Sequence, residues 1–178
     1  MNSFLKNRSV LDNVFLQIIN LIFIFWVFYF SPIDYECDAA STLINSKYIY
    51  HSIFTNEIVP ASWSYRAPLY KLIQILSGTF LFDSFNPIIF VHILFSFLMP
   101  IFFYFTLLHI NRKLALFGST ILILSLIPII HLKLILSVHS MIFFLVLSNY
   151  FLIKFIYKKN ISDFYFAFFL SLMLVLTR

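Results

Sequence analysis

The stretch PIIFVHILFSFLMPIFFYFTLLHI, residues 87–110, decides the fold of this chain. It contains no acid, lysine or arginine, and it is long enough to cross a bilayer core, which takes about 20 mostly apolar residues in a helix. Backbone groups in lipid must be hydrogen-bonded internally, so such a run is predicted to be a helix. Four other runs resemble it, the last being shorter: about Asn13 to Ser31, Leu114 to Leu132, His139 to Tyr157, and Phe164 to Thr177.

The composition of the whole chain fits this interpretation. The 178 residues are 62% hydrophobic and 11% charged, with a mean hydropathy of +0.97, whereas soluble domains have about a quarter of their residues charged. We therefore predict an all-α integral membrane protein in which residues 1–178 form one transmembrane domain of about five spans. Cys37 is the only cysteine, so neither an internal disulfide nor a cysteine metal cluster is possible.

The basic residues are topology signals rather than a nucleic-acid surface, despite the net charge of +5. They occupy short gaps between apolar runs, as expected of residues that remain cytoplasmic. The first apolar run is too long for a signal-peptide core of roughly 7–15 residues, so an uncleaved signal anchor is predicted. With alternating helices, seven cations fall on one side, which places the N-terminus in the cytoplasm: Lys6, Arg8, Arg112, Lys113, Lys154, Lys158 and Lys159.

The segment 32–86 is predicted to form an external loop with interfacial helices. It contains five of the seven acids: Asp34, Glu36, Asp38, Glu57 and Asp83. After Asp38, an apolar stripe that includes Ile44 and Tyr48 indicates a short helix lying in the membrane interface, with Asp38 as its N-cap. A second interfacial helix is predicted after Pro68, ending near Gly78.

Two groups of charged residues in this loop have both a structural and a functional interpretation. Asp34, Glu36 and Asp38 are either solvated loop charges or include a general base or metal ligand, because a carboxyl group beside lipid can have a raised pKa. The stretch 65–71 is either a proline-bounded loop from which Arg66 reaches lipid headgroups, or a site at which Arg66 and Lys71 bind an anionic phosphate. Four histidines in or near the apolar runs make no close metal-ligand spacing and are expected to have packing or interface roles: His92, His109, His131 and His139.

The order of these parts resembles the N-terminal part of the GT-C glycosyltransferases, which include protein O-mannosyltransferases and lipid A aminoarabinose transferases. The resemblance is carried by Asp38-Ala39-Ala40-Ser41, then Arg66-Ala67-Pro68-Leu69-Tyr70, and finally Leu176-Thr177-Arg178. It covers about Phe15 to Arg178. Members of that family usually continue through more helices, so the chain is expected to be a fragment of a longer enzyme.

The resemblance implies transfer of a sugar from a polyprenyl-phosphate donor to an acceptor hydroxyl outside a bacterial cell membrane. It implies Asp38 as the base, with Asp34 and Glu36 as alternatives, and Arg66 and Lys71 as ligands of the donor phosphate. Some relatives use a divalent metal, but no metal site or other cofactor is assigned, and membrane lipid is the expected surrounding. The rival hypothesis is a small non-catalytic membrane protein of envelope or polysaccharide assembly. A transporter fits less well, because the chain has only 2 glycines and few charges at mid-membrane depth.

Overall fold

The computed structural model of the chain describes residues 3–30, 44, 46–51, 53–54, 68–79, 86–125 and 137–177. Every regular element in these ranges is a helix. The bounded helices are α1 (Ser3–Phe30), α3 (Pro68–Leu76), α4 (Asn86–Leu108), α5 (Arg112–Leu124), α7 (Ser137–Lys158) and α8 (Ile161–Leu176). A further helical stretch covers residues 46–51.

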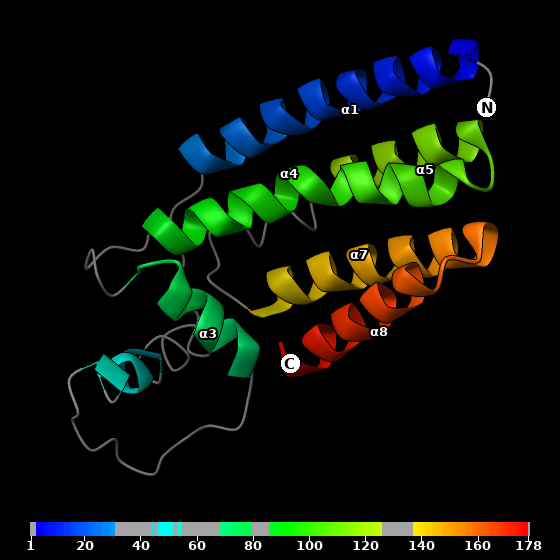
Figure 1. Cartoon of the computed structure of the whole chain (residues 1–178). Coiled ribbons are helices and arrows are strands. Elements are labelled where there is room, and N and C mark those ends of the chain that lie inside the picture. The colour runs from blue at the N-terminus through cyan, green and yellow to red at the C-terminus, as the bar shows by residue number, and fades with distance from the viewer. Residues whose placement is uncertain are drawn as a thin grey trace.

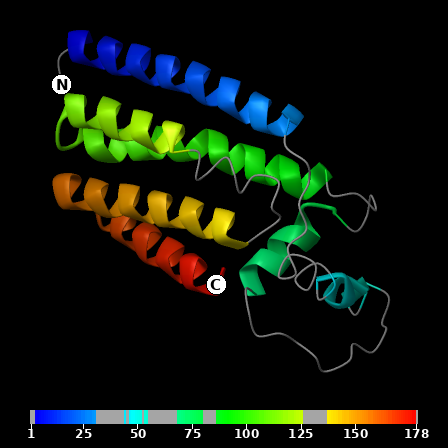
Figure 2. The ribbon, with the colours of Figure 1, turned by 180° about the vertical axis from the view of Figure 1, so that it is seen from behind.

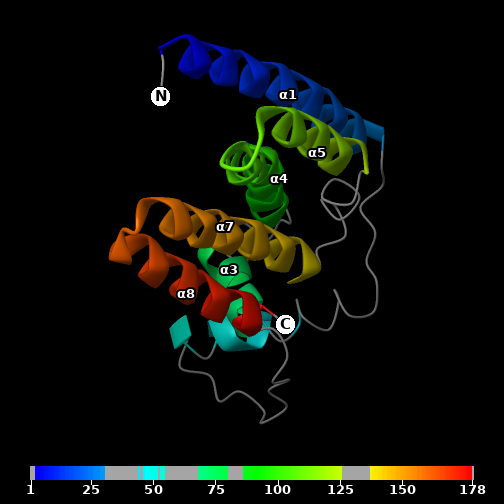
Figure 3. The same ribbon diagram turned by 90° about the vertical axis from the view of Figure 1, so that its right-hand side faces the viewer.

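The long helices lie side by side in a bundle (Figure 1). Helix α4 is central, because it contacts α1, α5 and α7, while α8 packs against α7. The view along the bundle shows α1 and α5 on one side of α4 and the α7–α8 pair on the other (Figure 3). The predicted all-helical fold is therefore confirmed for the described residues.

Three helical segments are long and apolar enough to cross a membrane: Ser9–Phe30, Pro87–Leu108 and Ser137–Lys158. Their residues are mostly apolar on all sides, so the lipid-facing surface is as apolar as the packed one. Helix α5 has 13 residues and α8 has 16, lengths that correspond to about 20 and 24 Å at 1.5 Å per residue. The structure thus supports a membrane protein with three candidate spans, and the expectation of five goes beyond them.

Helix α5 is shorter than the apolar run Leu114–Leu132 predicted. It ends at Leu124, and Ser125 forms its C-cap; residues 126–136 lie outside the described ranges. The sequence has a proline at position 128, and helices usually end at or before the residue preceding a proline. Length of an apolar run is therefore a poor guide to helix length where a proline interrupts it.

Pro100 lies inside α4, and a side chain of a neighbouring helix compensates for the backbone hydrogen bond that this proline removes. A proline has no N–H, so the carbonyl four residues earlier, that of Ser96, loses its usual partner. The amide of Asn20 on α1 donates to this carbonyl at 3.1 Å, and the bond is buried. The pair joins α1 to α4 within the apolar layer, where an unpaired carbonyl would be costly.

Helix α5 approaches α4 closely through small residues. Ala115 and Ser119 are fully buried, and a Cβ atom added at Gly118 would lie 2.5 Å from Leu107 Cδ1. Small side chains at such positions let two membrane helices approach each other, since packing rather than the hydrophobic effect drives their association in lipid. This contact fixes the α4–α5 hairpin.

The two ends of the bundle differ. The start of α1, the turn between α4 and α5, and the turn between α7 and α8 all lie at one end, while α3 lies at the other (Figures 1 and 2). The first end, here named the basic end, contains Arg112, Lys113, Lys154, Lys158 and Lys159. The prediction that these cations gather on one side of the bundle is confirmed for those five residues.

Candidate functional site at the α3 end

The predicted site residues are only partly described by the structure. Asp34, Glu36, Asp38 and Arg66 lie outside the described residues, so their predicted roles stay predictions. Lys71 is described and lies on α3. The candidate site is therefore built from α3 and the helix ends that it contacts.

Helix α3 follows from its local sequence. Pro68 occupies the first helical position, where a missing N–H costs nothing. The helix ends at Leu76, and Gly78 adopts a left-handed φ of 85° while its N–H donates to the Ile75 carbonyl at 3.1 Å. This glycine stop was predicted from the sequence and is confirmed.

One face of α3 is buried, and its chemistry is mixed. Tyr70, Lys71, Gln74 and Ile75 are buried, whereas Leu76 is exposed. Lys71 was predicted to bind a phosphate, and only 3% of it is exposed in this structure. Removal from water lowers the pKa of the Lys71 ammonium from its ordinary value of 10.5.

A buried polar chain connects α3 to the two long helices. The Tyr70 hydroxyl and His92 Nε2 on α4 are hydrogen-bonded at 3.2 Å. The rings of His92 and His139 lie 4.7 Å apart. His139 Nε2, on α7, donates to the His92 carbonyl at 2.9 Å and lies 3.2 Å from Ser96 Oγ. Because a carbonyl can only accept, this nitrogen of His139 carries a proton.

A second contact fastens α3 to the helical stretch 46–51. Ser46 Oγ donates to Gln74 Oε1, and both residues are fully buried. Tyr48 in this stretch and Ile44, which precedes it, are exposed. The helical character predicted after Asp38 is thus confirmed for residues 46–51.

Comparison of this chain with protein-family models, with curated proteins and with solved structures finds no match. The resemblance to GT-C glycosyltransferases therefore rests on the motifs of the sequence alone. What the geometry adds is that Lys71, predicted to bind phosphate, is buried on α3, the helix whose Tyr70 and Gln74 make buried polar contacts.

The cluster does not have the form of a metal site. Within the described ranges, no three side chains of the types His, Cys, Asp and Glu gather as metal ligands would. His92 and His139 turn their Nε2 atoms to different partners, a tyrosine hydroxyl and a backbone carbonyl. Their contact serves to pack α3, α4 and α7 together, which agrees with the packing role predicted for both histidines.

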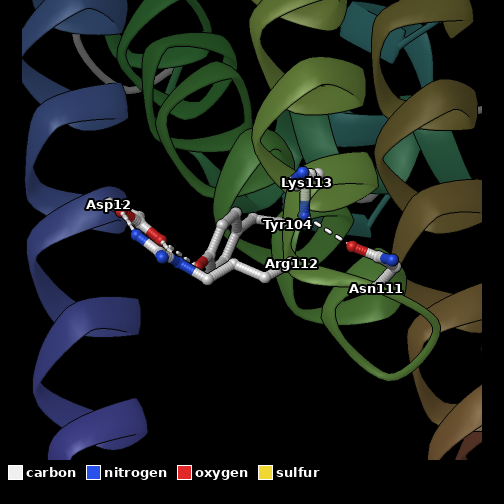
Figure 4. Close-up of polar contacts among 5 residues, drawn as sticks. All are labelled: Asp12, Tyr104, Asn111, Arg112 and Lys113. Carbon is white, nitrogen blue, oxygen red and sulfur yellow. Dashed lines mark hydrogen bonds and ion pairs between the residues drawn. The ribbon is translucent and has the colours of Figure 1, made fainter.

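Two acids that sequence reasoning left aside form ion pairs at the basic end. Asp12 on α1 accepts from Arg112 at two points: Nε to Oδ2 at 2.6 Å and Nη2 to Oδ1 at 2.7 Å. Tyr104 on α4 donates its hydroxyl to Asp12 Oδ2 at 3.1 Å. Figure 4 shows the three side chains meeting between their helices. This cluster joins α1, α4 and α5.

The other missed acid is Asp163, near the start of α8. Its Oδ1 accepts from Lys154 Nζ of α7 at 2.6 Å, and 4% of its side chain is exposed. A signal was available in the sequence, because Asp12 and Asp163 are the two acids outside the loop 32–86 and both lie among basic residues. An acid placed among the cations of a helix end is a candidate for pairing with them.

Proposed function

We propose that this protein binds a polyprenyl-phosphate-linked sugar at the α3 end and transfers the sugar to an acceptor hydroxyl there. In this proposal five helices cross a bacterial cell membrane, with α5 and α8 among them, the N-terminus is cytoplasmic, and α3 lies outside. The described helices include three candidate membrane spans. An enzyme that takes its sugar from a membrane lipid is expected to have such spans.

The proposed reaction uses residues of the loop 32–86. Asp38 takes the proton of the acceptor hydroxyl, and the acceptor oxygen attacks the anomeric carbon of the sugar. The bond between that carbon and the phosphate oxygen breaks, so polyprenyl phosphate leaves and the anomeric centre is inverted. Arg66 and Lys71 hold the phosphate charge; Asp34 and Glu36 are the alternative bases.

The observation that carries the proposal is the state of Lys71. Lys71 is 3% exposed, and its removal from water lowers the pKa of its ammonium group. Binding of an anionic phosphate beside it would favour its charged form and offset the cost of burial. Lysines that bind phosphate commonly act as such point charges.

The same burial favours one rival. If Lys71 keeps its place in the packing when the protein functions, no phosphate reaches its Nζ atom, and α3 is a structural part of the fold. The protein is then a small non-catalytic membrane component of envelope or polysaccharide assembly. The two hypotheses differ in whether α3 recognises a phosphate.

A binding experiment separates them. Purified protein in detergent is titrated with undecaprenyl phosphate and, as a matched ligand without the phosphate, undecaprenol, and bound lipid is counted by native mass spectrometry. We expect undecaprenyl phosphate to bind at least about tenfold more tightly, since hydrogen bonds to charged groups contribute roughly 1.5–3 kcal/mol. Equal affinity for the two lipids would reject the proposal.

Variants assign the binding to residues. Lys71→Met keeps the approximate length of the side chain and removes its charge, so it should remove most of the phosphate preference. Arg66→Ala should do the same. Lys47→Gln is the control, as Lys47 is exposed in the neighbouring helical stretch. A change as large in Lys47→Gln as in Lys71→Met would contradict a site on α3.

The acids are tested by turnover. Membranes containing the protein are supplied with undecaprenyl-phosphate mannose, and release of undecaprenyl phosphate is measured. Asp38→Asn should lower the rate about 10²–10⁴-fold, the usual contribution of a general base, and asparagine caps a helix about as well as aspartate. Full turnover in Asp38→Asn with loss in Asp34→Asn or Glu36→Gln would move the role to that acid.

A further inference from the structure

The turn between α7 and α8 presents two lysines, and no acid among the described residues pairs with either. Lys158 ends α7, Lys159 follows with a left-handed φ of 55°, and both are exposed. The structure describes two acids, Asp12 and Asp163, and each is already bound, to Arg112 and to Lys154 respectively. Within the described part of the chain, neither Lys158 nor Lys159 therefore has an acid to pair with.

An apolar groove begins next to this turn. It is lined by Ser162, Tyr165, Phe166 and Phe169 of α8 and has a volume of about 380 Å³. These positions follow the spacing of one helix face, so the groove runs along α8. Ser162 is the second residue of α8 and lies three residues after Lys159 in the chain, so the Ser162 end of the groove adjoins the α7–α8 turn.

Helix α7 supports one of the aromatic side chains that line the groove. Phe166 stacks on Phe151 of α7, with ring centroids 5.3 Å apart and planes inclined by 28°. Asp163 turns the other way, toward Lys154. The aromatic face is thus fixed by α7 on one side, while Tyr165 and Phe169 remain more than half exposed on the other.

We propose that this groove and the two lysines form a binding site for an anionic phospholipid. Lys158 and Lys159 bind the headgroup phosphate, and an acyl chain lies along Tyr165, Phe166 and Phe169. The charge of the turn selects the lipid, since basic pockets at the ends of membrane helices bind anionic headgroups. A zwitterionic headgroup adds a cation that these lysines repel.

The level of the site in the membrane agrees with this occupant. Lys158 is the last residue of a candidate span, so the turn lies where the apolar layer meets the headgroups. The lysine stems can lie along apolar surface while their ammonium groups reach phosphate. The proposed sugar-donor site is at the α3 end, at the other end of the bundle (Figure 1).

Lipid binding to the purified chain tests the site. Native mass spectrometry is used to titrate dioleoylphosphatidylglycerol against dioleoylphosphatidylcholine, which has the same acyl chains. We expect the anionic lipid to bind at least about fivefold more tightly. The double variant K158Q/K159Q should bring the two affinities to within about twofold, and Ser162→Trp, which fills the mouth of the groove, should weaken both lipids.

Lys113→Gln is the matched control, because Lys113 is exposed at the same end of the bundle but on α5 (Figure 4). It should leave the lipid preference unchanged. Three results would overturn the proposal: equal binding of both lipids to the parent protein, a loss in Lys113→Gln equal to that in K158Q/K159Q, or a dimer formed through α8 that binds neither lipid. The last result would assign the groove to a second copy of the chain.

Discussion

Asn20 donates a hydrogen bond to the Ser96 carbonyl, the one that Pro100 leaves without its helical partner. The two residues are 76 positions apart, so the bond joins α1 to α4 across the bundle. An asparagine in a membrane helix thus has a defined task, which is to complete the backbone hydrogen bonding of a proline-containing neighbour.

A double-mutant cycle tests this relationship. Asn20→Leu should lower the free energy of unfolding by about 1 kcal/mol, a typical net value for a hydrogen bond. Pro100→Ala restores an N–H to the helix, so Asn20→Leu should cost much less in that background. Thermal unfolding in detergent measures all four proteins. Equal costs of Asn20→Leu in both backgrounds would show that Asn20 and Pro100 are not coupled.

The Asp12–Arg112 pair should depend on its two-point geometry. Arg112→Lys keeps the charge but loses the planar fork, so it should recover only part of the stability lost in Arg112→Gln. Asp12→Asn should lower the unfolding temperature as well. The double variant Asp12→Asn/Arg112→Gln should unfold at a temperature only slightly below that of the less stable single variant. Additive losses in the double variant would indicate that the two side chains act independently.

The Lys154–Asp163 pair is more deeply buried, and its two halves should respond unequally. Lys154→Met leaves a carboxylate with 4% exposure and no counter-charge, which should cost on the order of 3 kcal/mol. Asp163→Asn leaves a lysine that is 24% exposed and can turn toward water, so it should cost less. Chemical denaturation of the reconstituted protein measures the unfolding free energy of both variants. A larger loss of stability in Asp163→Asn than in Lys154→Met would contradict this prediction.

The sequence predicts some helices of this structure more closely than others. The apolar run 87–110 has no charge, and α4 spans Asn86–Leu108, within two residues of the prediction. The end of α5 at Leu124 was not predicted, because hydropathy continues beyond it while the helix does not. Hydropathy registers the preference for lipid, whereas helix length also depends on backbone hydrogen bonds.

The site was harder to predict than the helices. Helix α3 and its stop at Gly78 follow from local turn chemistry. The burial of Lys71 and the contact of His92 with His139, 47 residues apart, depend on how α3 and α7 pack on α4. Spacing along the chain carries no direct signal for such contacts, and the histidine pattern alone indicated packing without a partner.

Lys71 should give the protein a pH-dependent stability. Its pKa is lowered in the folded state, so the unfolded chain binds more protons in the range between the lowered value and 10.5. Stability should therefore rise with pH across that range, as the folded protein is relieved of a buried charge. Lys71→Met should lack this rise up to about pH 10, because it has no group that titrates in the range. Thermal unfolding of both proteins over this range is the measurement, and parallel pH profiles would contradict a desolvated Lys71.

The central claim is that the basic end and the α3 end face opposite sides of a membrane. It is tested by cysteine accessibility in a Cys37→Ser background, with one cysteine at Lys47 beside α3 and another at Lys159 in the α7–α8 turn, both exposed positions. Sealed cells are treated with a membrane-impermeant thiol reagent before and after permeabilisation. We predict that Lys47→Cys is labelled in sealed cells and that Lys159→Cys is labelled only after permeabilisation. Labelling of both cysteines in sealed cells, or of neither, would contradict the account.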